Sequence, residues 1–163
     1  MRIIGIDPGF AITGYGVIEH ERGGFTMLDC GVVSTHAGLP MTDRLLTLSR
    51  RLEEIVNRWQ PQQGAVEELF FSKNEKTALN VGHGRGVALL CLARAGLQVY
   101  EYTPLQVKQA VTGYGRAEKS QIQYMVRILL NLPEPPRPDD AADALAVAIC
   151  HANAGTLARG GIV

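Results

Sequence analysis

The chain of 163 residues has the length of one domain, and its hydrophobic content of 46% is sufficient for one packed core. Its 16 basic and 16 acidic residues give a formal net charge of zero, which taken alone argues against binding of a phosphate backbone, because that binding is largely electrostatic. The N-terminus reaches Asp7 after only a few apolar residues. The sequence therefore predicts neither a signal peptide nor a membrane span. We accordingly expect a cytoplasmic location.

The predicted elements begin with three extended segments at residues 3–6, 14–19 and 25–34, the last two separated by a polar turn. Residues 42–59 have apolar side chains at helical spacing, with Thr42 as the predicted N-cap. The pattern then predicts a strand at 65–71, a helix at 74–95, a strand at 98–102 and closing helices at 119–130 and 140–153. This order predicts an α/β fold in which a five-stranded mixed sheet is flanked by helices. We expect one domain over residues 1–155 and a frayed tail at 156–163.

The charges are distributed unevenly along these elements. Residues 72–127 include eight basic and three acidic residues, a net charge of +5, so the remainder of the chain carries −5. A basic middle and acidic ends predict one binding face for an anionic partner, arranged around a cluster of carboxylates.

Acidic residues interrupt two of the apolar strands. Asp7 ends the first strand and is followed by Pro8 and Gly9, a turn pair that exposes the carboxylate at the strand edge, although an aspartate that simply caps its own turn is an alternative. Glu67 and Glu68 interrupt the strand predicted at 65–71. Because strand side chains alternate between faces, only one of these two glutamates can point where Asp7 points, and alternation alone does not decide which.

Asp140 and Asp143 lie three residues apart on the last predicted helix, a spacing that places both carboxylates on one helix face. Asp139 follows a proline and is better placed to cap the helix. The alternative is that these acids only complement the helix dipole. The rest of the helix is apolar, however, and acids that open a buried helix need a partner.

Four carboxylates from two strands and one helix suit a hard cation. Oxygen donors without a nearby histidine or cysteine favour Mg²⁺ or Mn²⁺ over zinc, and the sequence contains no C-x-x-C pair. Two such ions, about 3.5 to 4 Å apart, activate a water and stabilise the leaving oxygen of a phosphodiester. The sequence therefore predicts two-metal hydrolysis of a nucleic acid.

Five blocks of the chain resemble the RuvC family of bacterial resolvases, which cut four-way DNA junctions. They are Gly5-Ile6-Asp7-Pro8-Gly9 with Thr13-Gly14-Tyr15-Gly16, Val66-Glu67-Glu68 with Lys73-Asn74, Gln106-Val107-Lys108-Gln109, Ala117-Glu118-Lys119-Ser120, and Asp140-Ala141-Ala142-Asp143-Ala144-Leu145-Ala146. The resemblance implies a ribonuclease H-like fold and a catalytic, metal-binding set of Asp7, Glu67, Asp140 and Asp143, with Glu67 chosen over Glu68 by its spacing to Lys73. Some relatives have histidine where this chain has Asp140.

The resemblance also implies DNA contacts. Lys108 and Lys119 match positions near the scissile phosphate, Lys73 lies in a matched block, and Phe70 matches an aromatic residue that enters the junction centre. An exposed lysine is more commonly only solvated, and a phenylalanine on a strand is more commonly part of the core. His83 and His151 receive no role.

Partners follow from the same resemblance: junction DNA, a second copy of the chain that places two sites on opposite strands for paired nicks, and the RuvA–RuvB branch-migration motor. Ala78, Gly82 and Gly86 recur every fourth residue in the helix at 74–95, and such a row allows close approach of another helix, in the same chain or in a partner.

Three rival functions remain at this stage. A phosphotransferase of the actin and sugar-kinase type shares the first-strand motif, but it needs a second, similar domain. Another ribonuclease H-like nuclease, including one that cuts RNA, and a junction-binding protein without catalysis are the other two.

Overall fold

The computed structural model describes residues 1–69 and 75–160, and the side chains of residues 1–69 and 77–155. One mixed sheet of five strands runs in the order β3-β2-β1-β4-β5. Its strands are β1 (Arg2–Asp7), β2 (Ile12–Glu21), β3 (Gly24–Ser34), β4 (Gln63–Glu67) and β5 (Gln98–Tyr102). The first three strands are antiparallel, whereas β4 and β5 run parallel to β1. The predicted α/β class and five-stranded mixed sheet are confirmed.

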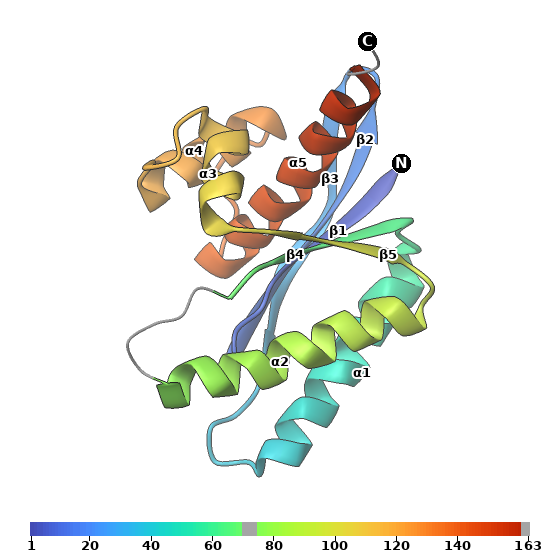
Figure 1. The fold of residues 1–163 in the computed structure, drawn as a ribbon, viewed down its shortest axis with the longest axis vertical. Helices are drawn as coiled ribbons and strands as arrows, with labels where there is room; N and C mark the ends of the chain where they lie inside the picture. The colour runs from blue at the N-terminus through green and yellow to red at the C-terminus, as the bar shows by residue number, and fades with distance from the viewer. Residues whose placement is uncertain (70–74, 161–163) are drawn as a thin grey trace.

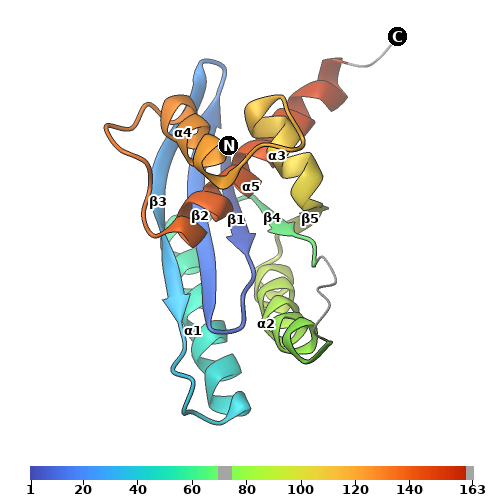
Figure 2. The same ribbon diagram turned by 90° about the vertical axis from the view of Figure 1, so that its left-hand side faces the viewer.

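Helices cover both faces of this sheet (Figure 1). On one face lie α1 (Met41–Trp59) and α2 (Glu75–Arg94), packed on Ile4, Ile6 and Val66. On the other face lie α3 (Pro104–Thr112), α4 (Lys119–Leu129) and α5 (Asp139–Gly160), packed on Ile3 and Ala65. The view turned by 90° shows the same division, with α3, α4 and α5 together in the upper part of the view and α1 and α2 in the lower part (Figure 2). None of the described helices has the length and apolar character needed to cross a membrane.

The central helix α5 lies unusually close to the sheet. A Cβ atom on Gly5 would overlap the carbonyl oxygen of Ala144, and one on Gly14 would overlap the carbonyl oxygen of Asp140. Two glycines on adjacent strands therefore allow the backbone of α5 to rest on the backbone of β1 and β2. This contact places the first turn of α5 over the carboxyl end of β1.

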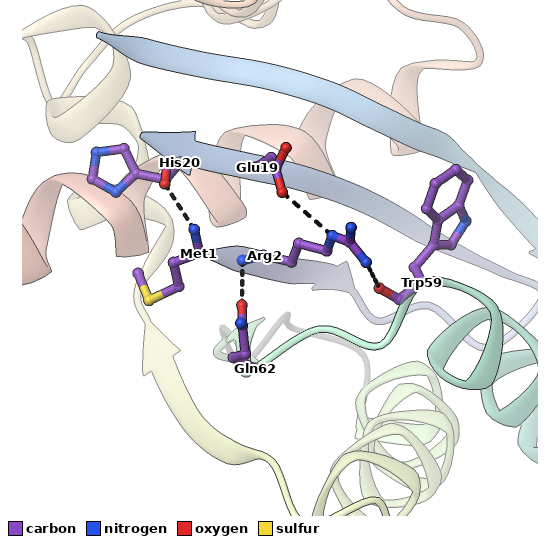
Figure 3. A network of polar contacts seen from close by, with 6 residues as sticks. All are labelled: Met1, Arg2, Glu19, His20, Trp59 and Gln62. Atoms are coloured by element: carbon purple, nitrogen blue, oxygen red, sulfur yellow. Dashed lines mark hydrogen bonds and ion pairs between the residues drawn. The ribbon is translucent and has the colours of Figure 1, made fainter. Parts of the chain in front are cut away.

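Polar contacts fix the opposite end of β1 (Figure 3). The Arg2 side chain donates to the Trp59 carbonyl oxygen at 3.1 Å and pairs with Glu19 at 3.4 Å, and the Arg2 backbone N–H donates to the Gln62 side chain at 2.5 Å. The N-terminal amino group of Met1 donates to a carbonyl oxygen of β2 at 2.9 Å. The strand that carries Asp7 is thus tied to α1, β2 and the start of β4.

Several predicted boundaries were wrong. The N-cap of α1 is Pro40 rather than Thr42. Strand β4 ends at Glu67 instead of continuing to residue 71, and α5 continues to Gly160 instead of ending at 153. Pro138, not Asp139, precedes the first helical residue of α5, and its carbonyl oxygen accepts the N–H of Ala141 at 3.0 Å.

Helix α3 was not predicted at all. It has a capping box in which the Thr103 hydroxyl accepts the Gln106 N–H at 3.2 Å and the Gln106 side chain accepts the Thr103 N–H at 2.8 Å. Pro104 occupies its first helical position, and Gly113 ends it in a left-handed conformation. These are recognisable start and stop signals in the sequence.

Candidate active site

Asp7 and Glu67 end adjacent parallel strands and point to the same face of the sheet. The register pairs Ile6 with Val66, so the next residue on each strand is one of the two acids. Ala65, two residues before Glu67, faces the helices α3 to α5, and alternation therefore turns Glu67 to that face as well. Glu68 lies beyond the strand end and is exposed. The structure therefore brings Glu67, and not Glu68, to Asp7.

The first turn of α5 brings the other two acids toward this pair. Asp7 is paired in register with Gly14, the residue on which the Asp140 backbone rests. Asp143, one turn further along, is about a quarter exposed at its side chain (26%). The charges of Asp140 and Asp143 both act on Asp7 and raise its pKa. The expected common face of these two carboxylates is therefore turned toward the strand ends.

Burial and mutual repulsion shift the ionisation of the pair. Burial, followed by the charges of Asp143 and Asp140, raises the pKa of Asp7 from 3.8 to about 6. Burial and then the charge of Asp7 raise the pKa of Glu67 from 4.5 to about 8. The two carboxyl groups share a hydrogen bond that lowers the pKa of Asp7 and raises that of Glu67. The pair therefore keeps a proton to a higher pH than two separate carboxyl groups would, and Glu67 is the member that donates the hydrogen bond to Asp7.

Two lysines bring positive charge to the carboxylates. The Nζ atom of Lys119, at the start of α4, lies 3.0 Å from Asp143 Oδ2 and 3.7 Å from Asp139 Oδ2. Lys108, on α3, is close enough to lower the pKa of Glu67. The sequence named both lysines, but only the structure shows that α3 and α4 converge on the acidic residues.

The described residues do not form a closed metal centre. Among residues 1–69 and 77–155, no group of three or more His, Cys, Asp or Glu side chains is arranged to hold one ion. Asp7 and Glu67 are in hydrogen-bond contact, whereas Asp143 is paired with Lys119. Phe70 and Lys73, two of the predicted DNA contacts, lie outside the described residues.

The turn after Asp7 is held by two residues that the sequence did not single out. Arg44 of α1 is buried (6% exposed), donates to the Phe10 carbonyl oxygen at 3.2 Å and to the Thr35 hydroxyl at 3.0 Å, and stacks 3.6 Å above the Phe10 ring. On the α2 side, a Cβ atom on Gly84 would lie 2.8 Å from the Gly9 carbonyl oxygen. The two helices thus clamp the turn that follows Asp7.

His151 has a structural environment. Its ring is buried, with Nδ1 2.7 Å from the Tyr102 hydroxyl and Nε2 2.8 Å from Gln63 Oε1, and it stacks on Tyr100 at 4.3 Å between ring centroids. Burial lowers its pKa. These contacts join α5 to β4 and β5 and leave no ring nitrogen of His151 for catalysis.

The donor set fits a divalent cation. Four carboxylates, if all ionised, carry more negative charge than the ammonium groups of Lys108 and Lys119 can balance, and this excess contributes to the raised pKa values of Asp7 and Glu67. A cation of charge +2 bound between them would restore the ionised forms, and carboxylate oxygens are the ligands that Mg²⁺ and Mn²⁺ prefer. The arrangement can therefore bind a metal at the edge of the sheet, beside two lysines that are able to contact a phosphate.

Comparison with known proteins identifies the family. A family model described as crossover junction endodeoxyribonuclease RuvC matches residues 3–151. A protein of that name from Ruminiclostridium cellulolyticum is 60% identical over 94% of this chain and 92% of its own. Another, from Chloroflexus aggregans, is 58% identical over 99% of both chains.

A solved structure supports the same assignment. Thermus thermophilus RuvC in complex with a Holliday junction substrate superposes with a TM-score of 0.92 at 39% identity, over 97% of this chain and 96% of the other. The fold is therefore the ribonuclease H-like fold expected from the resemblance, and the kinase alternative is excluded. The chain belongs to the RuvC family of crossover junction endodeoxyribonucleases.

Proposed function

We propose that this protein is a structure-selective endonuclease that resolves four-way DNA junctions by paired, symmetric hydrolysis of phosphodiesters during homologous recombination and repair. The observation that carries the proposal is the cluster of half-buried carboxylates beneath the first turn of α5, in a chain of the RuvC family. The Thermus relative in complex with its junction substrate supports the choice of DNA. Residues 1–155 would act as one nuclease domain.

RuvC nucleases are metal-dependent, and we assign the metal to Asp7, Glu67, Asp140 and Asp143. Two Mg²⁺ ions, for which Mn²⁺ can substitute, would supply an activated water and stabilise the leaving oxygen. Asp7 interacts with Glu67 and with both acids of α5, so it is the residue best placed to be shared by both ions. For these groups to bind metal, Glu67 must lose its proton and Asp143 must release Lys119.

Lys108 and Lys119 would hold the phosphate that is cut. Each ammonium group interacts with one of the carboxylates. When a metal ion binds the carboxylates in its place, the ammonium group can pair with a backbone phosphate. The same family resemblance assigns Lys73 to DNA binding and Phe70 to the junction centre.

The protein would act as a homodimer through α2. Leu79 is 64% exposed and Leu90 is 57% exposed, and His83 and Gly86 lie between them on the same face. A Cβ atom on Gly86 would meet nothing within 4 Å. Two exposed leucines on either side of an open glycine suit close packing of two α2 helices. In the cell, the RuvA–RuvB motor would deliver the substrate.

Cleavage of a synthetic mobile junction tests the proposal. With Mg²⁺ or Mn²⁺ the protein should make paired nicks, and with EDTA it should bind the junction without cutting it. A duplex of the same sequence and an RNA–DNA hybrid are the controls. Preferential cutting of the hybrid would instead favour another ribonuclease H-like nuclease, and junction binding without cleavage in any divalent metal would favour a binding protein.

A further inference from the structure

A hollow of about 350 Å³ lies between the end of α3, the loop that follows it and the first turns of α4. Tyr114 and Tyr124 contribute aromatic rings to its lining, Met125 contributes an apolar side chain, and Ser120 and Gln121 contribute polar groups. Its volume falls at the lower end of the range for small-ligand sites, about 300 to 1,000 Å³. The hollow therefore has room for one flat, aromatic ligand.

The two tyrosines are unusually free for aromatic residues. Tyr114 is 58% exposed and Tyr124 is 55% exposed. In the part of the chain that the structure describes, neither ring packs against another ring, and neither hydroxyl group makes a hydrogen bond. Exposed rings beside basic side chains are the platforms on which proteins stack nucleic-acid bases.

Two residues that line the hollow lie close in the chain to the lysines that act on the carboxylates. Ser120 directly follows Lys119, whose Nζ atom lies 3.0 Å from Asp143. Thr112, another lining residue, follows Lys108 by four residues on α3, one helical turn or about 6 Å. Stacked nucleotides rise about 3.4 Å each along a strand. A strand held at Lys108 and Lys119 therefore reaches the hollow within one or two nucleotides.

The charge around the hollow favours a DNA strand over a neutral aromatic ligand. The stretch of chain that lines the hollow, residues 108–125, carries three basic residues, Lys108, Arg116 and Lys119, and one acidic residue, Glu118. The backbone N–H of Glu118 donates to Gln121 Oε1 at 2.8 Å, which fixes the start of α4 and directs the amide of Gln121. An amide and a hydroxyl group at the rim can both hydrogen-bond to a base edge.

We propose that this hollow binds one nucleobase of the strand being cut, displaced from the stack and held against the Tyr114 and Tyr124 rings, one or two nucleotides from the scissile phosphate. This inference rests on the proposed function and extends it, because it places a determinant of cleavage-sequence preference at Tyr124, Ser120 and Gln121. The site is distinct from the carboxylates.

Abasic nucleotides test the inference in cleavage. We use a set of junctions that each lack one base near the cut. At one position of the missing base, the single-turnover rate of the wild-type protein should fall by about 5- to 150-fold, the stacking contribution of a single base. On the intact junction, Tyr124→Ala should cut more slowly than the wild type by the same factor. On the abasic junction that slows the wild type, Tyr124→Ala and the wild type should cut at the same rate. Tyr124→Phe should behave as the wild type on both junctions. Ile128→Ala, an exposed apolar residue one turn further along α4, is the matched control.

A binding measurement separates this inference from the nuclease proposal. The fluorescent base 2-aminopurine, placed at the same position, should change its emission when wild-type protein binds in EDTA, and Tyr124→Ala should abolish the change. That result would support the site even if no junction were cut. The inference is overturned if no single base matters to the wild type, or if Tyr124→Ala loses as much on the abasic junction as on the intact one.

Discussion

Asp7→Asn should abolish cleavage and at the same time stabilise the metal-free protein. The carboxylate of Asp7 is held among Glu67, Asp140 and Asp143, and its pKa is raised from 3.8 to about 6 by burial and by those charges. Each pH unit corresponds to about 1.4 kcal/mol, so ionised Asp7 costs the folded state up to about 3 kcal/mol. An amide of the same shape removes that cost.

The sign of the pH dependence follows from the raised pKa. The folded state binds the Asp7 proton more tightly than the unfolded state does, so the destabilisation is fully present above about pH 6 and disappears as the pH falls toward 4. The gain in stability of Asp7→Asn over the wild type should therefore be largest at pH 7 to 8. The substitution also removes the attraction between Asp7 and Lys119, so we expect the free energy of unfolding to rise by about 1 to 3 kcal/mol. For a chain of this size, each kcal/mol corresponds to about 2 to 4 °C in Tm.

Thermal unfolding in EDTA at pH 8 and pH 4.5 measures the effect, with Asp43→Asn, an exposed acid in the first turn of α1, as the matched control. Adding Mg²⁺ should then raise the Tm of the wild type more than that of Asp7→Asn. Junction affinity should be nearly unchanged, because lysines and arginines supply it. An unchanged or lower Tm for Asp7→Asn at pH 8, or near-normal nicking in Mg²⁺, would falsify the placement of Asp7 in a repulsive metal site.

Four further predictions address neighbouring features. Gly86→Leu should separate the two copies in sedimentation and uncouple paired nicks, whereas Gly155→Leu, at an equally open helical glycine, should leave the dimer intact; a wild type that is monomeric yet still makes paired nicks would contradict the dimer. Lys119→Ala should weaken junction binding and flatten its log-log salt dependence by about one unit, and an unchanged slope would argue against a phosphate contact. Phe70→Ala should cut intact junctions poorly and recover on junctions with mismatched centres, with about 1 to 3 kcal/mol of stacking at stake; a loss of about 3 to 5 kcal/mol in stability without mismatch rescue would make it a core residue. Arg44→Met should lower kcat and cost about 1 to 3 kcal/mol of stability with little change in junction affinity, and an unchanged kcat would show that the Asp7 turn does not need the clamp.

Local patterns in the sequence predicted the elements well, and the contacts between elements less well. The period-two pattern located β4 but could not choose between Glu67 and Glu68, because that choice depends on which sheet face α5 covers. The register of Ile6 with Val66 supplies the answer. The sequence missed α3 although its signals were local, since Thr103, Pro104 and Gln106 form an ordinary helix start.

Contacts between distant segments could not be predicted in this way. The approach of Lys119 to Asp143 depends on how α4 and α5 cross, and the burial of Arg44 against Phe10 depends on how α1 packs below the Asp7 turn. No spacing within one element encodes either contact. The family resemblance named Lys119 from its block of sequence, whereas Arg44 belongs to none of the five blocks and was therefore overlooked.

The small residues of α2 limit which substitutions this helix can accept during evolution. Gly84 meets the Gly9 carbonyl oxygen on the inner side of the helix, and Gly86, two residues later, opens to solvent on the outer side. A larger side chain at Gly84 would displace the turn that carries Asp7, and a displacement of about 1 Å at a reacting group can cost about 100-fold in rate. A larger side chain at Gly86 would change only the outer surface. We therefore expect natural variants to tolerate substitutions of Gly84 less than substitutions of Gly86.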